Sequence, residues 1–243
     1  MPMLEATGVN KAFGGLKAVS NVDFYVGEGE ILGLIGPNGA GKTTLFNLIS
    51  GACQMDSGAV IFNGTKISGM KPNRICRLGI GRSFQAAKNF AGMPVRQNVL
   101  MGALFGEKGR THAQALKIVD EVLDFVGLGE LCDKMVPDIP LAYQKRLEVA
   151  RALATSPKLL MLDEMMAGLN PTEVGESMEL VTKIRESGIT IIMIEHVMQA
   201  IMSICDRIIV LHHGAKIAEG TPLEISTSKT VIEVYLGEEC STT

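Results

Sequence analysis

The sequence predicts an α/β fold built on buried parallel strands, and three observations carry this prediction. A short apolar run at 31–35 is followed by a glycine-rich loop and then by apolar residues at helical spacing. Two further apolar runs, at 159–162 and 189–194, are joined by one helical segment, as parallel neighbours usually are. Residues 85–137, between these parts, are mostly helical in pattern and predict an inserted subdomain.

Composition limits the class of protein. At 243 residues the chain is long enough for one large domain or for a core with a subdomain. Hydrophobic residues make up 47% and charged residues 20%, which is typical of a globular protein. The net charge of −3 offers no basic field, so we expect no nucleic-acid partner.

Cysteines and hydropathy give further expectations. The five cysteines are scattered without a Cys-x-x-Cys pair, so we expect neither a zinc site nor a disulfide framework. We expect reduced thiols in a cytosolic protein. The N-terminus has no signal-peptide pattern. No apolar run reaches about 18 residues, so we expect no membrane span and a membrane role only through a partner.

The first strands are expected to form a hairpin. Residues 3–12 and 19–26 have strand patterning, with 16–17 in the connection. Phe13 ends the first strand beside two glycines. An aromatic ring close to a nucleotide loop can stack on adenine, whereas one at a hairpin end can equally belong to the core. The pattern leaves both interpretations of Phe13 open.

The loop after the 31–35 strand has the spacing Gly-x-x-x-x-Gly-Lys-Thr. Its glycines let backbone N–H groups approach phosphates closely, and the helix beginning near Lys42 adds its positive dipole end. Lys42 would contact the outer phosphates, and the Thr43 hydroxyl would ligate Mg²⁺. A glycine turn before an ordinary helix is the alternative, but the strand, loop and helix together favour a triphosphate site. The predicted nucleotide-binding loop consists of Gly36, Pro37, Asn38, Gly39, Ala40, Gly41, Lys42, Thr43 and Thr44.

The middle of the chain alternates strand and helix signals. Residues 58–62 predict a strand that ends in a tight turn, and 98–105 predict a helix. Thr111–Gln114 has the pattern of a capping box, and the helix after it is expected to stop at Gly127. Residues 139–143 predict a short loop that leads into another helix.

Two acids follow the apolar run 159–162, where a buried parallel strand would end. The carboxyl ends of such strands are where α/β sheets bind ligands. Asp163 there would hold Mg²⁺ through water, and Glu164 could polarise an attacking water. The alternative is that Asp163 and Glu164 are two surface acids without a role. The phosphate loop earlier in the chain weakens this alternative.

The next strand, 189–194, ends in Glu195-His196 after a helix capped by Asn170–Glu173. A lone histidine at a strand end is usually structural, but this strand is expected to lie parallel to the Asp163 strand. A closing hairpin around His213-Gly214 and one or two short helices complete the chain. Adjacent His212 and His213 would point to opposite sides of a strand and make a poor metal pair.

Together these motifs resemble the ATP-binding subunit of ABC transporters, in that family's order over essentially the whole chain. The resemblance is strongest to subunits that serve importers of branched-chain or hydrophobic amino acids. Local matches lie at Phe-Gly-Gly-Leu 13–16, Ser-Phe-Gln 83–85, Ala-Gly-Leu-Asn-Pro 167–171 and Ile-Ala-Glu-Gly-Thr-Pro 217–222.

The resemblance implies a P-loop NTPase core with an antiparallel β subdomain and an inserted helical subdomain. Divided along the chain, residues 1–84 hold the β subdomain and the phosphate loop. Residues 85–154 hold the helical subdomain with the signature loop, and residues 155–243 hold the rest of the core.

The resemblance also implies roles for single residues, with ATP and Mg²⁺ as cofactors. Phe13 would stack on adenine, Glu164 would be the catalytic base, and His196 would contact the γ-phosphate. Gln85 would contact Mg²⁺ and the attacking water and pass the ATP state to the helical subdomain. The implied metal contacts are Thr43, Gln85 and Asp163.

The implied partners are membrane-spanning permease subunits, a second ATP-binding subunit and, indirectly, a solute-binding protein, at the cytoplasmic face of the inner membrane. In the family's head-to-tail dimer, Gly168–Asn170 would cross to the partner subunit. The signature Leu-Ser-Gly-Gly-Gln is replaced here by Ile-Pro-Leu-Ala-Tyr at 139–143. This change predicts a heterodimer with an intact-signature partner, although a homodimer is possible in isolation. The alternatives are a soluble ABC-type ATPase and a nucleotide-binding module with little turnover.

Overall fold

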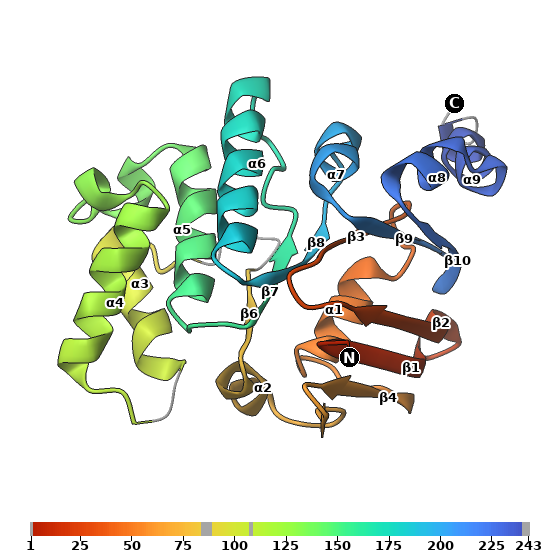
Figure 1. Ribbon diagram of the computed structural model, residues 1–243, viewed down its shortest axis with the longest axis horizontal. Coiled ribbons are helices and arrows are strands. Elements are labelled where there is room, and N and C mark those ends of the chain that lie inside the picture. The colour runs from red at the N-terminus through yellow and green to blue at the C-terminus, as the bar shows by residue number, and fades with distance from the viewer. Residues whose placement is uncertain (1, 84–88, 107–108, 240–243) are drawn as a thin grey trace. The chain divides into compact units, whose positions relative to one another are not determined.

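The computed structural model describes residues 2–83, 89–106 and 109–239, whose helices and strands are drawn in Figure 1. The chain folds as two units. One unit comprises Met1–Pro72 and Thr190–Thr243, and the other comprises Asn73–Ile189. Both contain strands and helices, in agreement with the predicted α/β class. The finer division of the chain at residues 84 and 154 stays a prediction.

An antiparallel sheet in the first unit confirms the predicted hairpin but corrects its turn. Leu16 and Lys17 belong to the second strand, because Phe13 pairs directly with Leu16. Gly14 adopts a φ of +57°, which lets a two-residue turn close without strain on a side chain. The order across this sheet is β2 (Leu16–Val26), β1 (Leu4–Phe13), β4 (Ser57–Phe62) and β5 (Thr65–Lys66).

The second sheet of this unit is built around a fully buried central strand. Strand β3 (Ile31–Ile35) runs parallel to β8 (Thr190–Ile194) on one side and to β9 (Arg207–His212) on the other. All residues of β3 and β8 are buried, as expected for strands covered on both faces. Strand β10 (Ala215–Gly220) closes an antiparallel hairpin with β9.

Gly33 in β3 marks a close approach of the backbone to a helix end. A Cβ there would lie 3.0 Å from the Sγ of Cys205, which directly follows α7 (Met198–Ile204). The thiol is buried, and this burial raises the pKa of Cys205 to about 12. A larger residue at this point of the strand would have to push the Cys205 thiol aside by a few tenths of an ångström.

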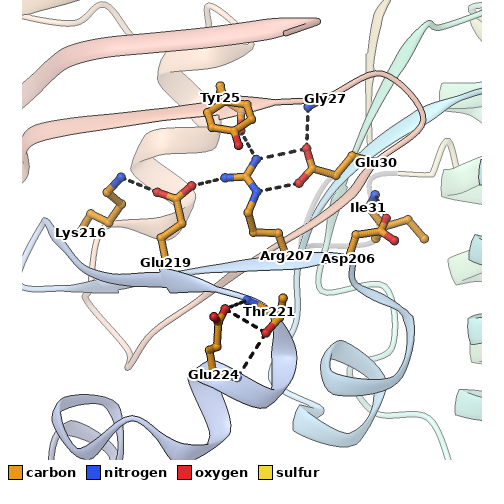
Figure 2. Close-up of polar contacts among 10 residues, drawn as sticks. All are labelled: Tyr25, Gly27, Glu30, Ile31, Asp206, Arg207, Lys216, Glu219, Thr221 and Glu224. Carbon is orange, nitrogen blue, oxygen red and sulfur yellow. Dashed lines mark hydrogen bonds and ion pairs between the residues drawn. The ribbon is translucent and has the colours of Figure 1, made fainter.

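The remaining helices of the first unit are α1 (Lys42–Ile49), α8 (Pro222–Thr227) and α9 (Lys229–Glu239), and α8 begins with a capping box. The phosphate loop leads into α1, and the chain ends with α8 and α9. Thr221 caps α8, because its hydroxyl accepts a bond from the N–H of Glu224 while the Glu224 carboxylate accepts from Thr221 (Figure 2).

In the second unit, α3, α4 and α5 pack against one another (Figure 1). Thr111 and Gln114 form the predicted capping box at the start of α4. The second unit also holds a parallel pair of strands, β6 and β7. Its elements are α2 (Pro72–Leu78), β6 (Ile80–Arg82), α3 (Val95–Phe105), α4 (His112–Phe125), α5 (Leu141–Leu153), β7 (Leu159–Asp163) and α6 (Pro171–Glu186), with short 3₁₀ turns η1 (Gly129–Leu131) and η2 (Val136–Asp138).

Helix α3 begins three residues earlier than predicted, because buried Asn98 fixes the segment before it. Its side-chain oxygen accepts a bond from the N–H of Phe90 at 2.8 Å. Its amide nitrogen donates to the carbonyls of Phe90, Met93 and Pro94 at 3.1–3.2 Å. A residue that looks unremarkable in the sequence thus organises a whole loop.

Two other predictions are corrected. Leu141–Tyr143 form the first turn of α5, with Pro140 before it, and not the loop predicted for 139–143. Proline is compatible with a helix start because the N–H it lacks would have no partner within the helix. His212 and His213 lie with ring centroids 4.0 Å apart, because His213 turns out of the strand with a φ of +46°.

Candidate functional site

The phosphate loop adopts the curled backbone that its glycines predict. Gly36 has a φ of +148°, and Gly39 and Gly41 have φ values of +79° and +101°. A Cβ at Gly36 would lie 2.1 Å from the carbonyl oxygen of Leu211, so this position has no room for a side chain. At Gly39 nothing lies within 4 Å, and glycine there is required by conformation alone.

The start of α1 is arranged to receive an anion. Gly41 is its N-cap and, as a glycine, has no side chain with which to cap the first turn. The Nζ of Lys42 is buried within the loop and donates to the carbonyls of Gly36 at 2.5 Å and Pro37 at 2.9 Å. The free N–H groups of a helix start and an ammonium group are donors that a phosphate chain requires. The helix dipole adds a positive potential at the same place.

Phe13 is not a core residue. It lies at the hairpin end with 52% of its surface exposed, and the ammonium of Lys11 lies 5.2 Å from its ring centroid. The interpretation of Phe13 as a hairpin-end core residue is therefore wrong, and its stacking on adenine stays a prediction.

His196 lies at the same edge of the sheet as the phosphate loop. Leu34 of β3 pairs in parallel with Ile194 of β8, so the two strands end side by side. One strand leads into Gly36 and the other into Glu195-His196. His196 itself is exposed, as a residue that contacts a ligand should be.

The second unit holds the predicted acids. Asp163 ends β7 with 1% of its surface exposed, and its Oδ2 accepts from the Arg82 guanidinium at 3.0 Å. Its N–H donates to the Oγ of Ser83 at 3.1 Å. Burial raises the pKa of the Asp163 carboxyl, and Arg82 opposes that shift. The other oxygen, Oδ1, is buried without a hydrogen-bond partner among the described residues, so its capacity to accept a bond is unused there.

Glu164 follows with a left-handed backbone. Its φ is +51°, and its carbonyl oxygen accepts from the Nζ of Lys145 at 3.1 Å. Lys145 lies on α5 and is buried. A non-glycine residue in this conformation stores strain of about 1–3 kcal/mol, which a fixed neighbour such as Lys145 can hold in place.

The segment after Glu164 is ordered by a cap. Asn170 accepts a bond from the N–H of Glu173 at 3.0 Å, and the carboxylate of Glu173 accepts from Asn170 at 2.9 Å. Gly168 has a φ of +80°, and a Cβ there would lie 3.3 Å from Leu141 of α5. The predicted cap is thus confirmed.

Not every predicted residue can be located, and some contributors were not predicted. Gln85 lies in 84–88, outside the described residues. Arg82 and Lys145 belong to no motif, and Ser83 belongs to the Ser-Phe-Gln match at 83–85 without a role of its own. Their position is the signal that the sequence offers, since Arg82 ends strand β6 and Ser83 directly follows it.

Comparison with known proteins agrees with this arrangement. The profile of the ABC transporter family matches residues 19–167, and that of the branched-chain amino acid ATP-binding cassette transporters matches residues 215–241. The chain is 38% identical to the high-affinity branched-chain amino acid transport ATP-binding protein BraF of Pseudomonas aeruginosa, over 98% of each chain. It is 39% identical to the corresponding protein LivG of Salmonella typhimurium, also over 98% of each chain.

The fold agrees as well. The crystal structure of a nucleotide-free ATP-binding cassette from an ABC transporter matches with a TM-score of 0.87 at 30% identity, covering 97% of this chain and 99% of that one. In the described ranges, every helix is too short or too polar to span a bilayer. With a family profile over more than half of its length and full-length relatives, the chain belongs to the ABC transporter family of ATPases.

Proposed function

We propose that this chain is the ATP-hydrolysing subunit of an importer for branched-chain or other hydrophobic amino acids. Separate permease subunits would carry the solute, and the chain would work at the cytoplasmic face of the cell membrane. Support comes from full-length relatives named as branched-chain amino acid transport ATP-binding proteins. The match of the C-terminal residues 215–241 to the branched-chain profile supports the same assignment.

The observation that carries nucleotide binding is the loop in front of α1. Left-handed Gly41 presents a helix start without a side-chain cap, beside the ammonium group of Lys42. We assign the β- and γ-phosphates to this loop, 36–44, and adenine to the exposed face of Phe13. Lys42 would exchange its loop carbonyls for phosphate oxygens on binding.

The residues present fit Mg²⁺. The unpartnered Oδ1 of Asp163 is a hard oxygen donor of the kind this ion prefers, and a hydroxyl from Thr43 and an amide oxygen from Gln85 would complete the protein contacts. When bound, the ion neutralises charge on the phosphates. Arg82 would keep Asp163 charged and oriented for it.

We assign hydrolysis to Glu164, which would accept a proton from the attacking water. Lys145 donates to the backbone carbonyl of Glu164 and would help to hold the backbone that carries this carboxylate. His196 would donate a hydrogen bond to the γ-phosphate, and Gln85 would help to orient the water.

The dimer we propose is asymmetric. In a head-to-tail pair, residues 139–143 would face the partner's nucleotide, yet this segment has no serine and no glycine. Pro140 also lacks a backbone N–H that could replace the missing donor. This chain would therefore supply an active phosphate loop and take the active signature from a different subunit. A solute-binding protein would act only through the permease.

Reconstitution tests the assignment. The chain should be purified alone, with a consensus-signature partner, and with that partner and permease subunits in vesicles. An importer subunit should show ATP-dependent uptake of leucine, isoleucine or valine and ATPase activity that rises on assembly. High ATPase activity of the chain alone, without stimulation by the permease, would instead favour a soluble ATPase. Nucleotide binding without turnover in any assembly would favour a binding module.

A further inference from the structure

Three distant segments of the first unit meet behind the phosphate loop. The N–H of Gly214, in the β9–β10 turn, donates to the carbonyl of Ala40 in the loop at 3.0 Å. The carbonyl of Gly214 accepts from the N–H of Ser20, in β2, at 2.8 Å. One residue of the turn therefore bridges the loop and the strand by backbone bonds alone.

The packing at this point leaves no space for side chains. A Cβ at Gly214 would lie 2.9 Å from the carbonyl oxygen of Ala18 and 3.0 Å from that of Lys17. A Cβ at Gly41 would lie 2.2 Å from the same Ala18 oxygen and 3.4 Å from the Cα of Gly214. Because all of these neighbours are backbone atoms, they cannot move aside as a flexible side chain could.

The other end of the β9–β10 hairpin is also fixed. Arg207 donates to both carboxylate oxygens of Glu30 at 2.8 and 3.1 Å and to the carbonyl of Tyr25 at 2.7 Å, and it pairs with Glu219 of β10 (Figure 2). Its guanidinium also lies 4.1 Å from the Tyr25 ring centroid. The hairpin is thus braced against β2 and the start of β3, so its turn has a defined position.

We propose that the β9–β10 turn is a positioning element for nucleotide binding, and that Gly214 is its positioning residue. By holding the carbonyl of Ala40 from behind, the turn keeps the loop curled with its N–H groups directed at the phosphates. This inference rests on the proposed function, because it assumes that loop 36–44 binds nucleotide.

The chain offers a matched control in the β4–β5 turn. His213 and Gly214 have φ values of +46° and +79°, and Asn63 and Gly64 have +46° and +74°. Both are two-residue hairpin turns, yet nothing lies within 4 Å of a Cβ at Gly64. Alanine therefore suffers the same left-handed backbone strain in both turns, but meets neighbouring backbone only at Gly214.

The experiment compares Gly214→Ala with Gly64→Ala in the otherwise intact chain. We expect Gly214→Ala to weaken ADP and ATP binding at least tenfold by calorimetry, whereas Gly64→Ala stays within twofold of the wild type. In the assembled complex, Gly214→Ala should raise the KM for ATP more than it lowers kcat. Wild-type nucleotide affinity in Gly214→Ala, or an equal loss in both variants, would overturn the proposal.

A measurement on the wild type covers the case in which Gly214→Ala does not fold. Amide hydrogen exchange should slow at Gly214 and Ser20 when ADP binds, by at least threefold, because the loop and its support become ordered together. The N–H of Ile67, which bonds Val60 beside the control turn, should not change. Unchanged exchange at Gly214 on saturation with ADP contradicts the proposal. A wild type that binds no nucleotide contradicts the proposed function instead.

Discussion

At the scale of single residues, Glu164 combines a strained backbone with an assigned chemical role. Glu164→Gln keeps the size of the side chain and removes the base, so ATP binding should persist while kcat falls about 10²–10⁴-fold. Steady-state ATPase assays of the assembled complex check this. Glu179→Gln, an exposed position on α6, is the control and should retain full activity. A loss smaller than threefold in Glu164→Gln would mean that another group is the base.

Lys42 is the second residue whose removal should be decisive. Lys42→Ala deletes the ammonium group that the loop carbonyls now hold, so Mg-ATP binding should become too weak to detect by calorimetry at micromolar protein. Lys66→Ala, at an exposed position of β5, removes the same charge without touching the loop. Normal affinity in Lys42→Ala would place the phosphates elsewhere.

The place of a single residue in the site could be predicted only where a sequence motif surrounds it. The loop 36–44, Asp163 and Glu164 could be placed at the ends of buried strands from the sequence pattern, and their roles stay predictions. The contacts of Arg82 and Lys145 could not be predicted, because Arg82 meets the Asp163 carboxylate, and Lys145 the Glu164 backbone carbonyl, only after separate elements have packed together. Phe13 stayed ambiguous in the sequence, since its exposure depends on how the hairpin packs.

At the scale of elements, helix starts could be predicted where a capping residue marks them. The predictions were wrong where a helix start depends on tertiary contacts. The starts of α4 and α6 follow from Thr111 and Asn170, whose side chains satisfy the first turn. Helices α3 and α5 instead begin after prolines, at Val95 and Leu141, with no side-chain cap. Their starts depend on partners elsewhere, which local pattern does not contain.

Asn98 on α3 tests this dependence. Asn98→Ala removes the four hydrogen bonds that this buried side chain makes to the preceding segment, including the one it accepts from the N–H of Phe90. We expect the free energy of unfolding to fall by about 1–3 kcal/mol in urea titrations. ATP binding should persist because the phosphate loop belongs to the other unit. Gln97→Ala, at the exposed neighbouring position, should change stability by less than about 0.5 kcal/mol. Equal midpoints for the two variants would show that Asn98 does not hold the segment.

At the scale of the whole molecule, the altered segment 139–143 predicts unequal nucleotide sites. The loss of one hydrogen-bond donor to a developing negative charge raises the activation barrier by about 2.7–4 kcal/mol in comparable sites. A homodimer would have this loss at both of its nucleotide sites. In a heterodimer, Glu164→Gln should abolish most ATPase activity, whereas the equivalent change in the partner should leave most of it. The asymmetric arrangement would be falsified by equal losses, or by full activity of a homodimer of this chain.

The buried thiol of Cys205, which lies against Gly33, can report when the first unit opens. Thiolate is the form that alkylating reagents attack, and with a pKa of about 12 Cys205 is almost entirely protonated at pH 8. Cys205 should therefore resist modification for as long as α7 stays packed on the sheet, while the half-buried Cys53, Cys76 and Cys132 react sooner. Mass spectrometry of pulse-labelled samples would then read the opening rate of the nucleotide-binding unit from one peptide. Any ligand that tightens this unit should lengthen the half-time of labelling at Cys205, which would provide a screen for ligands that needs neither transport nor hydrolysis.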